Sequence, residues 1–192
     1  MRTVVVPFAG AAGKTRLAAA RRTRQEVSLA MLGDVLAAAL AVGATLVVTG
    51  DDAGASLARE LGAHVVDDPG GGQGAAVAAA LARAGAGAAL VVNADLPCVT
   101  ADDLEALTDA IPAHGLALVE AADGTTNALG LSSPSVFAPV YGPGSADRFR
   151  GLTASSVTVA VPNLVDDVDT LADLERLFAR CGPRTQACLA TT

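Results

Sequence analysis

Short apolar runs of strand length alternate along this chain with stretches whose apolar residues recur at helical spacing. This alternation is typical of an α/β fold with a mainly parallel sheet. The expected strands are Thr3–Pro7, Thr45–Thr49, residues 63–68 and the apolar run AALVV that precedes Asn93. The expected helices are residues 23 to about 40, 51–62 with Gly62 as the stop, 75–84, and 100–111 with Thr100 as the N-cap.

The second half of the chain is less regular. LALVEAA (116–122) and NALGLSS (127–133) are expected to be paired strands, residues 145–152 a short helix, and SVTVAVP (156–162) a strand. Residues 170–181 read as a closing helix and about 183–192 as a loose tail. With 192 residues, no internal repeat and no polar linker, residues 1–192 are expected to form a single domain.

The formal net charge is −7, although charged residues make up only 17% of the chain. This balance argues against a nucleic-acid-binding protein, which needs a basic face. A small anionic substrate remains compatible with it. In an acidic protein such a substrate would call for divalent metal ions that bridge carboxylates and phosphates.

Cysteines and histidines offer little catalytic material. Three scattered cysteines (98, 181 and 188) argue against a disulfide framework, and two isolated histidines (64 and 114) match no metal pattern. The apolar stretch of residues 35–48 is shorter than a membrane span, and the N-terminus lacks the features of a signal peptide. A cytoplasmic protein with no membrane partner is therefore expected.

The stretch PFAGAAGKTRL (7–17) ends in Gly-Lys-Thr directly after the first strand. A P-loop requires a glycine at position 8, where this chain has Phe8, and Gly10 lies only three residues before Gly13. The loop is therefore not a P-loop. It either presents backbone N–H groups with Lys14 and Arg16 to a triphosphate, or is a surface turn whose cations are solvated.

Two acidic motifs could hold a metal ion. In NADLP, Asp95 follows the expected central strand, where open α/β sheets bind ligands. In VDDVDT, Asp167 and Asp169 would point to the same side of an extended segment. Either motif alone could be an ordinary turn or helix cap. Together they supply the three carboxylates that two-metal phosphoryl or nucleotidyl transfer commonly uses.

Two small-residue loops, DGTTN (123–127) and YGPGS (141–145), expose backbone N–H groups. Such loops suit a carboxylate or a phosphate, and they equally suit plain tight turns.

The chain resembles one known family in an ordered set of motifs. In chain order, these are the Gly/Ala loop with KTRL, AMLGDVLAAAL, the DPG-rich loop, ADLP, the GTT loop, GPGS and DVDT. The chain is similar to the 2-phospho-L-lactate and phosphoenolpyruvate guanylyltransferases of coenzyme F-420 biosynthesis, from about residue 3 to 178. The resemblance implies a single-domain nucleotidyltransferase fold, glycosyltransferase-A-like and Rossmann-related, with a mainly parallel mixed sheet flanked by helices.

The resemblance also implies roles for individual residues. Asp95, Asp167 and Asp169 match the acidic residues that hold two Mg²⁺ ions and carry catalysis. Thr126, Gly142 and Ser145 would bind the carboxylate end of the substrate. Lys14 would bind its phosphate. The nucleotide would contact Ala9, Gly10, Gly13, Lys14, Arg16, Gln73 and Gly74.

The implied reaction joins GMP from GTP to the phosphate of a three-carbon phospho-acid and releases pyrophosphate. A downstream transferase that takes up the unstable product and a homodimer are further expected partners. Two alternatives stay open: a molybdenum-cofactor or sugar-phosphate nucleotidyltransferase, and a catalytically silent nucleotide-binding protein.

This chain departs from the family pattern at several places. Phe8 and Ala9 stand where relatives usually carry a lysine, and Gln73-Gly74 replaces a usual Leu-Asn. The threonine loop is one residue shorter, and Arg148-Phe149 stands where a histidine is common.

Overall fold

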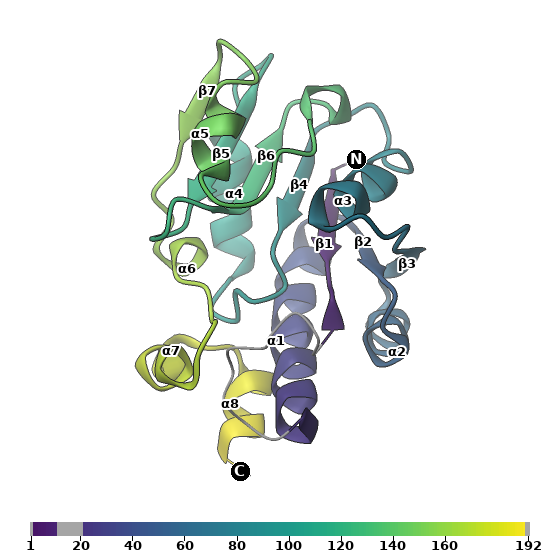
Figure 1. Ribbon diagram of the computed structural model, residues 1–192, viewed down its shortest axis with the longest axis vertical. Coiled ribbons are helices and arrows are strands. Elements are labelled where there is room, and N and C mark those ends of the chain that lie inside the picture. Colours follow the sequence, from purple (N-terminus) through teal and green to yellow (C-terminus); the bar gives the residue numbers. More distant parts are fainter. Residues whose placement is uncertain (1, 11–20, 191–192) are drawn as a thin grey trace.

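The computed structural model describes residues 2–10 and 21–190, and in them one seven-stranded sheet lies between two layers of helices (Figure 1). The strands are β1 (Thr3–Pro7), β2 (Ala44–Thr49), β3 (His64–Asp67), β4 (Ala89–Val92), β5 (Leu116–Glu120), β6 (Thr126–Leu131) and β7 (Ser156–Thr158). The α-helices are α1 (Arg21–Val42), α2 (Asp52–Leu61), α3 (Gln73–Leu81), α4 (Ala101–Asp109), α5 (Ser145–Arg150), α6 (Pro162–Val165), α7 (Leu171–Leu177) and α8 (Pro183–Ala190). Two 3₁₀ turns, η2 (Pro134–Val136) and η3 (Phe178–Arg180), complete the described elements.

The strand order is β3-β2-β1-β4-β6-β5-β7. β1 pairs in parallel with both β2 and β4, β2 with β3, and β5 with β7. Only β6 runs against its neighbours β4 and β5. The sheet is therefore mixed and mainly parallel, which confirms the fold class expected from the sequence, including the paired strands β5 and β6.

Both faces of the sheet are buried. Alternate residues of β1 enter opposite cores: Val4 and Val6 pack with helices α1, α2, α4 and α6, whereas Val5 packs with α3 and α5. In Figure 1, α3 and α5 lie in front of the sheet and α1 and α4 behind it. Burial on both faces explains why the parallel strands read as continuous apolar runs instead of alternating ones.

Local sequence signals set several helix boundaries. The Asp51 carboxylate accepts a hydrogen bond from the Gly54 N–H and begins α2, which ends at the left-handed Gly62. Thr100 begins α4 through a reciprocal capping box with Asp103, as the sequence predicts.

Two expectations for the C-terminal part are wrong. The strand expected over residues 156–162 stops at Thr158, and Pro162 instead occupies the first turn of α6, where its missing N–H costs nothing. Residues 183–190 are not a loose tail, because they form α8 and pack against α1. Their order depends on Asp34 in α1, whose carboxylate accepts the backbone N–H groups of Arg184 (3.1 Å) and Thr185 (2.8 Å).

By length and composition, one described helix could cross a membrane: Arg24–Val42 of α1, with mean hydropathy 1.5. It is longer than the apolar stretch of residues 35–48 noted in the sequence. In the fold, 56% of its most apolar window is buried, and Leu32, Val35 and Leu36 belong to the core. α1 is accordingly a core helix of this domain.

Candidate active site

The candidate site lies at the edge of the sheet where three strand ends meet. β1 ends there at Pro7 and β4 at Val92, and the antiparallel strand β6 begins there at Thr126. The chain builds outward from β1 through β2 to β3, and then places β4 on the other side of β1. Such a switch point opens a crevice at the carboxyl ends of the strands, which is where α/β sheets bind ligands.

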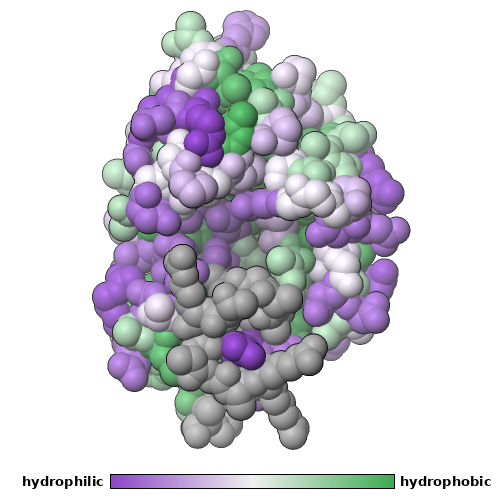
Figure 2. Space-filling model, in the orientation of Figure 1, coloured by the Kyte–Doolittle hydropathy of each residue, from purple (hydrophilic) through white to green (hydrophobic). Residues whose placement is uncertain are grey.

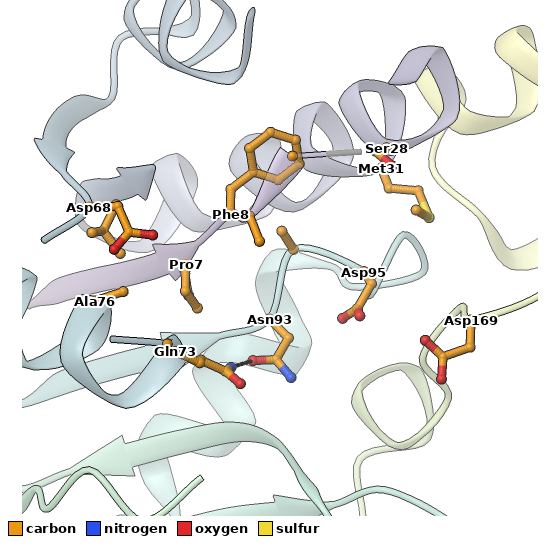
Figure 3. A pocket seen from close by; sticks show the side chains of 15 residues that line it. Pro7, Phe8, Ser28, Met31, Asp68, Gln73, Ala76, Asn93, Asp95 and Asp169 are labelled. Atoms are coloured by element: carbon orange, nitrogen blue, oxygen red, sulfur yellow. Dashed lines mark hydrogen bonds between the residues drawn. The ribbon is translucent and has the colours of Figure 1, made fainter. Parts of the chain in front are cut away.

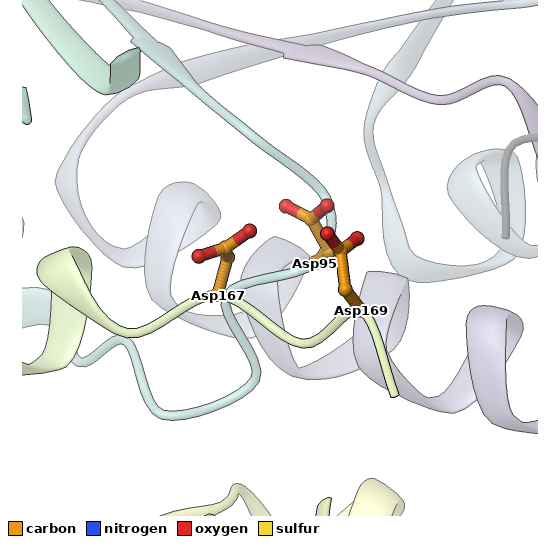
Figure 4. Close-up of side chains that lie close together, drawn as sticks. All are labelled: Asp95, Asp167 and Asp169. Carbon is orange, nitrogen blue, oxygen red and sulfur yellow. The ribbon is translucent and has the colours of Figure 1, made fainter. Parts of the chain in front are cut away.

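Three aspartates converge at this edge. Asp95, in the turn after β4, and Asp167 and Asp169, before α7, each offer a carboxylate oxygen, and these oxygens lie within 4.8 Å of one another (Figure 4). It is the one such acidic group in residues 2–10 and 21–190. All three residues are half-buried. The structure thus brings together the two acidic motifs that the sequence singled out separately.

Residues 165–170, here called the aspartate segment, are held from both sides. The Val168 N–H donates to the Asp95 carbonyl at 3.0 Å, and the Val168 side chain is buried between the neighbouring helices. The Asp173 carboxylate accepts the N–H groups of Asp169 (3.2 Å) and Thr170 (2.9 Å). Because Val168 points inward, its two neighbours Asp167 and Asp169 both face the crevice.

Asp166 belongs to a different contact set from Asp167. Its carboxylate accepts hydrogen bonds from Arg176 at 2.9 Å and Arg180 at 2.8 Å, which ties the aspartate segment to α7 and η3. Partial burial raises the pKa of the Asp166 carboxyl, but the hydrogen bonds from Arg180 and Arg176 outweigh burial and hold that pKa below its ordinary value. Asp166 is therefore a charged structural anchor.

A pocket of about 310 Å³ opens beside the aspartates (Figure 3). Asp95 and Asp169 lie at one end and Asp68 at the other, with Pro7 and Phe8 between them. Its remaining lining residues are Ala9, Gly10, Ser28, Met31, Val48, Gly72, Gln73, Ala76, Asn93 and Ala94. In the space-filling view, the surface is hollowed below α3 and α5, with hydrophilic residues in the hollow (Figure 2). We call this cavity the first pocket.

A second pocket, of about 590 Å³, lies between residues 71–75, where α3 begins, and residues 139–142. Gly74 makes this close approach possible, since a Cβ at that position would lie 2.7 Å from the Cβ of Pro139. Gln73 lines both pockets and Gly142 lines the second. The second pocket therefore adjoins the first, and the Gln73 side chain lies between them.

Thr126 and Ser145 meet inside the protein next to these pockets. The Ser145 hydroxyl donates to the Thr126 hydroxyl at 3.1 Å, and both residues are buried. The loop before Ser145 turns through Gly142 and Gly144, both at positive φ, a region that favours glycine. The Arg148 guanidinium clasps this loop by donating to the carbonyls of Val140, Tyr141 and Pro143.

Known proteins resemble this chain in sequence. The model of the MobA-like NTP transferase domain matches residues 19–142. A phosphoenolpyruvate guanylyltransferase from Nocardia farcinica is 40% identical over 191 aligned positions, which cover 92% of this chain and 84% of that protein. The chain belongs to this guanylyltransferase family. A protein of the same name from Streptomyces scabiei is 38% identical, and the match covers 98% of this chain and 95% of that protein.

Solved structures agree with the fold of this chain. A nucleotidyl transferase from Methanothermobacter superposes with a TM-score of 0.70 at 18% identity, covering 100% of this chain and 99% of that chain. The structure of Rv0371c from Mycobacterium tuberculosis H37Rv gives a TM-score of 0.64 at 27% identity, covering 92% and 96%. These likenesses show that the chain shares its fold with these proteins.

The structure describes the loop after β1 only in part. Ala9 and Gly10 line the first pocket, whereas Gly13, Lys14 and Arg16 lie outside the described residues. Phe8, where the family pattern has a lysine nearby, is 6% exposed and packs its ring directly on α2. The Phe8 position therefore contributes an apolar pocket wall.

Sequence reasoning missed three polar residues of the candidate site. Asp68 and Asn93 line the first pocket, and the buried Asn127 donates to the Val165 carbonyl at 3.0 Å, at the start of the aspartate segment. Asn93 was visible as the first polar residue after the β4 run. Asn127 carried no such signal, because its partner is 38 residues away.

Proposed function

We propose that this chain transfers GMP from GTP to the phosphate of phosphoenolpyruvate and releases pyrophosphate. 2-Phospho-L-lactate is the second acceptor to test. A phosphate oxygen of the acceptor attacks the α-phosphorus of GTP, a P–O bond forms, and the bond to the β-phosphate breaks. The single observation that carries this proposal is the convergence of Asp95, Asp167 and Asp169, of which Asp95 and Asp169 line one end of the first pocket.

The chemistry needs charge compensation more than a strong base. The phosphate of the acceptor is already ionised near neutral pH, and it must approach a nucleotide that is also an anion. Repulsion between the two is therefore the main obstacle. Carboxylates that bind metal ions meet this requirement, and Asp95, Asp167 and Asp169 could hold such ions.

The three carboxylates are suited to Mg²⁺, and we propose two such ions. Oxygen ligands of one Mg²⁺ at ~2.1 Å lie at most about 4.2 Å apart, so oxygens within 4.8 Å need only small side-chain rotations to share ions. When bound, the ions would neutralise phosphate charge and align the reacting groups. Asp95, Asp167 and Asp169 would hold them, and Val168 keeps the last two facing the crevice.

The pockets suggest where each substrate binds. The first pocket runs from the aspartates to Asp68 and suits an extended nucleotide, with Ala9, Gly10 and Gln73 beside it. We place the triphosphate against Gly13, Lys14 and Arg16. The three-carbon acid would lie toward Thr126, Gly142 and Ser145, with Gly74 at the boundary and Lys14 near its phosphate.

Pyrophosphate release tests this function. The purified protein is incubated with Mg²⁺ and one nucleotide triphosphate, together with phosphoenolpyruvate, 2-phospho-L-lactate or 3-phosphoglycerate. We expect release with GTP and phosphoenolpyruvate. No release with any three-carbon phospho-acid would overturn the proposal and leave a sugar-phosphate or molybdopterin acceptor, or a silent nucleotide-binding protein.

Three further expectations accompany this function. We propose that the protein works in the cytoplasm within coenzyme F-420 biosynthesis. We also propose that it passes an unstable product to a downstream transferase, and that it forms a homodimer. Size-exclusion chromatography with light scattering measures the oligomeric state directly.

A further inference from the structure

Gln73 stands between the two pockets and is anchored from behind. It lines both the first and the second pocket, and its amide nitrogen donates to the Asn93 side-chain oxygen at 2.7 Å (Figure 3). The side-chain oxygen of Gln73 accepts no hydrogen bond from another described residue. A ligand in either pocket therefore meets a side chain whose direction is set by Asn93.

Asn93 passes this contact on to the next strand. Its side-chain nitrogen donates to the Thr126 carbonyl at 3.2 Å, and its backbone N–H donates to the Asn127 carbonyl at 3.1 Å. The backbone hydrogen bond extends the pairing of β4 and β6 to Asn93. It thereby fixes the direction in which the Asn93 side chain points. The Thr126 hydroxyl in turn accepts a hydrogen bond from the Ser145 hydroxyl at 3.1 Å.

These bonds link four residues in a polar chain, Gln73, Asn93, Thr126 and Ser145, in which Asn93 bonds the backbone carbonyl of Thr126 and Ser145 its hydroxyl. It crosses from the start of α3 through the end of β4 and the start of β6 to the start of α5. Thr126 is 2% exposed and Ser145 0%, so their hydrogen bonds are shielded from water. A displacement of Asn93 is therefore costly at the Thr126 end, because it leaves the buried Thr126 carbonyl without this donor.

We infer that Asn93 is a positioning residue that couples Gln73, at the boundary of the pockets, to the acceptor-side pair Thr126 and Ser145. The inference rests on the proposed function, because it assigns the acceptor to the Thr126 side. Asn93 needs no contact with the reacting atoms for this role. Its effect on the acceptor passes through the Thr126 carbonyl.

A double-mutant cycle separates this coupling from direct contact. Kinetics are measured for the wild type, Gln73→Ala, Asn93→Ala and the double variant. We expect Asn93→Ala to raise the acceptor KM about three- to tenfold, the size expected for one lost hydrogen bond. We expect Gln73→Ala to raise the acceptor KM in the wild type and to add little once Asn93 is gone.

The Mg²⁺ dependence distinguishes positioning from general damage. The Mg²⁺ concentration for half-maximal rate should stay unchanged in Asn93→Ala, because Val168 rather than Asn93 holds the aspartate segment. Gln186→Ala is the matched control. Gln186 lies on α8, away from the pockets, and its side-chain amide also donates to a backbone carbonyl, that of Phe178. This variant should leave every kinetic constant unchanged. Asn93→Ser replaces Asn93→Ala if circular dichroism shows that the latter is unfolded.

Each result decides the question. Effects of Gln73→Ala and Asn93→Ala that multiply in the double variant would overturn the coupling, as would an unchanged acceptor KM in Asn93→Ala. In both cases the active wild type would leave the proposed function standing. A wild type that releases no pyrophosphate overturns the proposed function itself, and this inference with it.

Discussion

At the scale of single residues, neighbouring aspartates have opposite roles. Asp167 faces the crevice with Asp95 and Asp169, whereas Asp166 binds Arg176 and Arg180. The alternation follows from an extended backbone, in which successive side chains point to opposite sides. Composition alone does not distinguish these two positions, but their contacts do.

We expect Asp167→Asn to lower the rate of pyrophosphate release by about a hundredfold or more, because it removes a carboxylate ligand of the Mg²⁺ ions that would compensate the phosphate charges. Asp166→Asn, one residue away and identical in chemistry, should keep most of the activity. Steady-state rates at saturating Mg²⁺ measure both. Equal losses in the two variants would contradict the assignment of Asp167 to the metal cluster.

Asp166→Asn should instead lower thermal stability in a pH-dependent way. The pKa of Asp166 is lowered in the folded state, so its ionised form stabilises the fold above the ordinary value of 3.8. This stabilisation is lost as the pH falls through the lower folded-state pKa. Melting temperatures should therefore differ between wild type and variant near pH 7, and converge as the pH drops well below 3.8.

Asn127→Ala tests how the aspartate segment is held. The substitution leaves the Val165 carbonyl without its buried donor, at a cost of ~1–3 kcal/mol in the free energy of unfolding. We also expect a higher Mg²⁺ concentration for half-maximal rate, since Asp167 follows Val165 by two residues. Urea unfolding and Mg²⁺ titrations measure these effects, and an unchanged titration would contradict the positioning role.

At the scale of elements, the C-terminal helix is set by a contact distant in sequence. α8 begins where Asp34 of α1 accepts two of its first N–H groups, and the Gly182 N–H donates to the Pro97 carbonyl at 2.7 Å. Gly182 permits this approach, because a Cβ there would lie 2.3 Å from the Asp34 carboxyl carbon. The α8 sequence by itself contains no sign of either contact.

We expect Asp34→Ala to lower the free energy of unfolding by ~0.5–2 kcal/mol, the usual effect of losing a helix cap. Hydrogen exchange should rise selectively in α8. Asp109→Ala, an exposed aspartate at the end of α4, is the control and should change stability little. Unchanged exchange in α8 would show that Asp34 does not hold the helix.

At the scale of the whole molecule, substrate binding and folding are linked. Ligands that bind only the folded state stabilise it, by ~2.7 kcal/mol at a hundred times Kd. We expect GTP with Mg²⁺ to raise the melting temperature of the wild type markedly and that of Asp95→Asn much less. Equal shifts in both proteins would show that Asp95 takes no part in binding the metal–nucleotide complex.

Much of this molecule can be predicted from local sequence. The apolar runs identified the parallel strands, because strands covered on both faces contain few polar residues. Thr100 and Gly62 marked helix ends through their own chemistry. The acidic motifs NADLP and VDDVDT were recognisable as metal-binding candidates because they supply carboxylates, the ligand type that Mg²⁺ prefers.

The pattern failed where a boundary depended on distant partners. A short apolar run such as SVTVAVP suits a strand, but it becomes one only where a neighbouring strand supplies hydrogen bonds, and β5 does so only as far as Val159, whose N–H donates to the Leu118 carbonyl at 2.9 Å. Likewise, the last helix exists because Asp34 caps it. Both outcomes depend on groups far away in the sequence.

Fold class, central strands and the three candidate carboxylates thus follow from residue types and their order, since hydrophobic burial and strand geometry act over a few neighbouring residues. The meeting of Asp95 with Asp167 and Asp169, the packing of Gly74 on Pro139, and the polar chain through Asn93 depend on the folded chain. These contacts join segments tens of residues apart, and only the fold of the sheet and its connections brings them together.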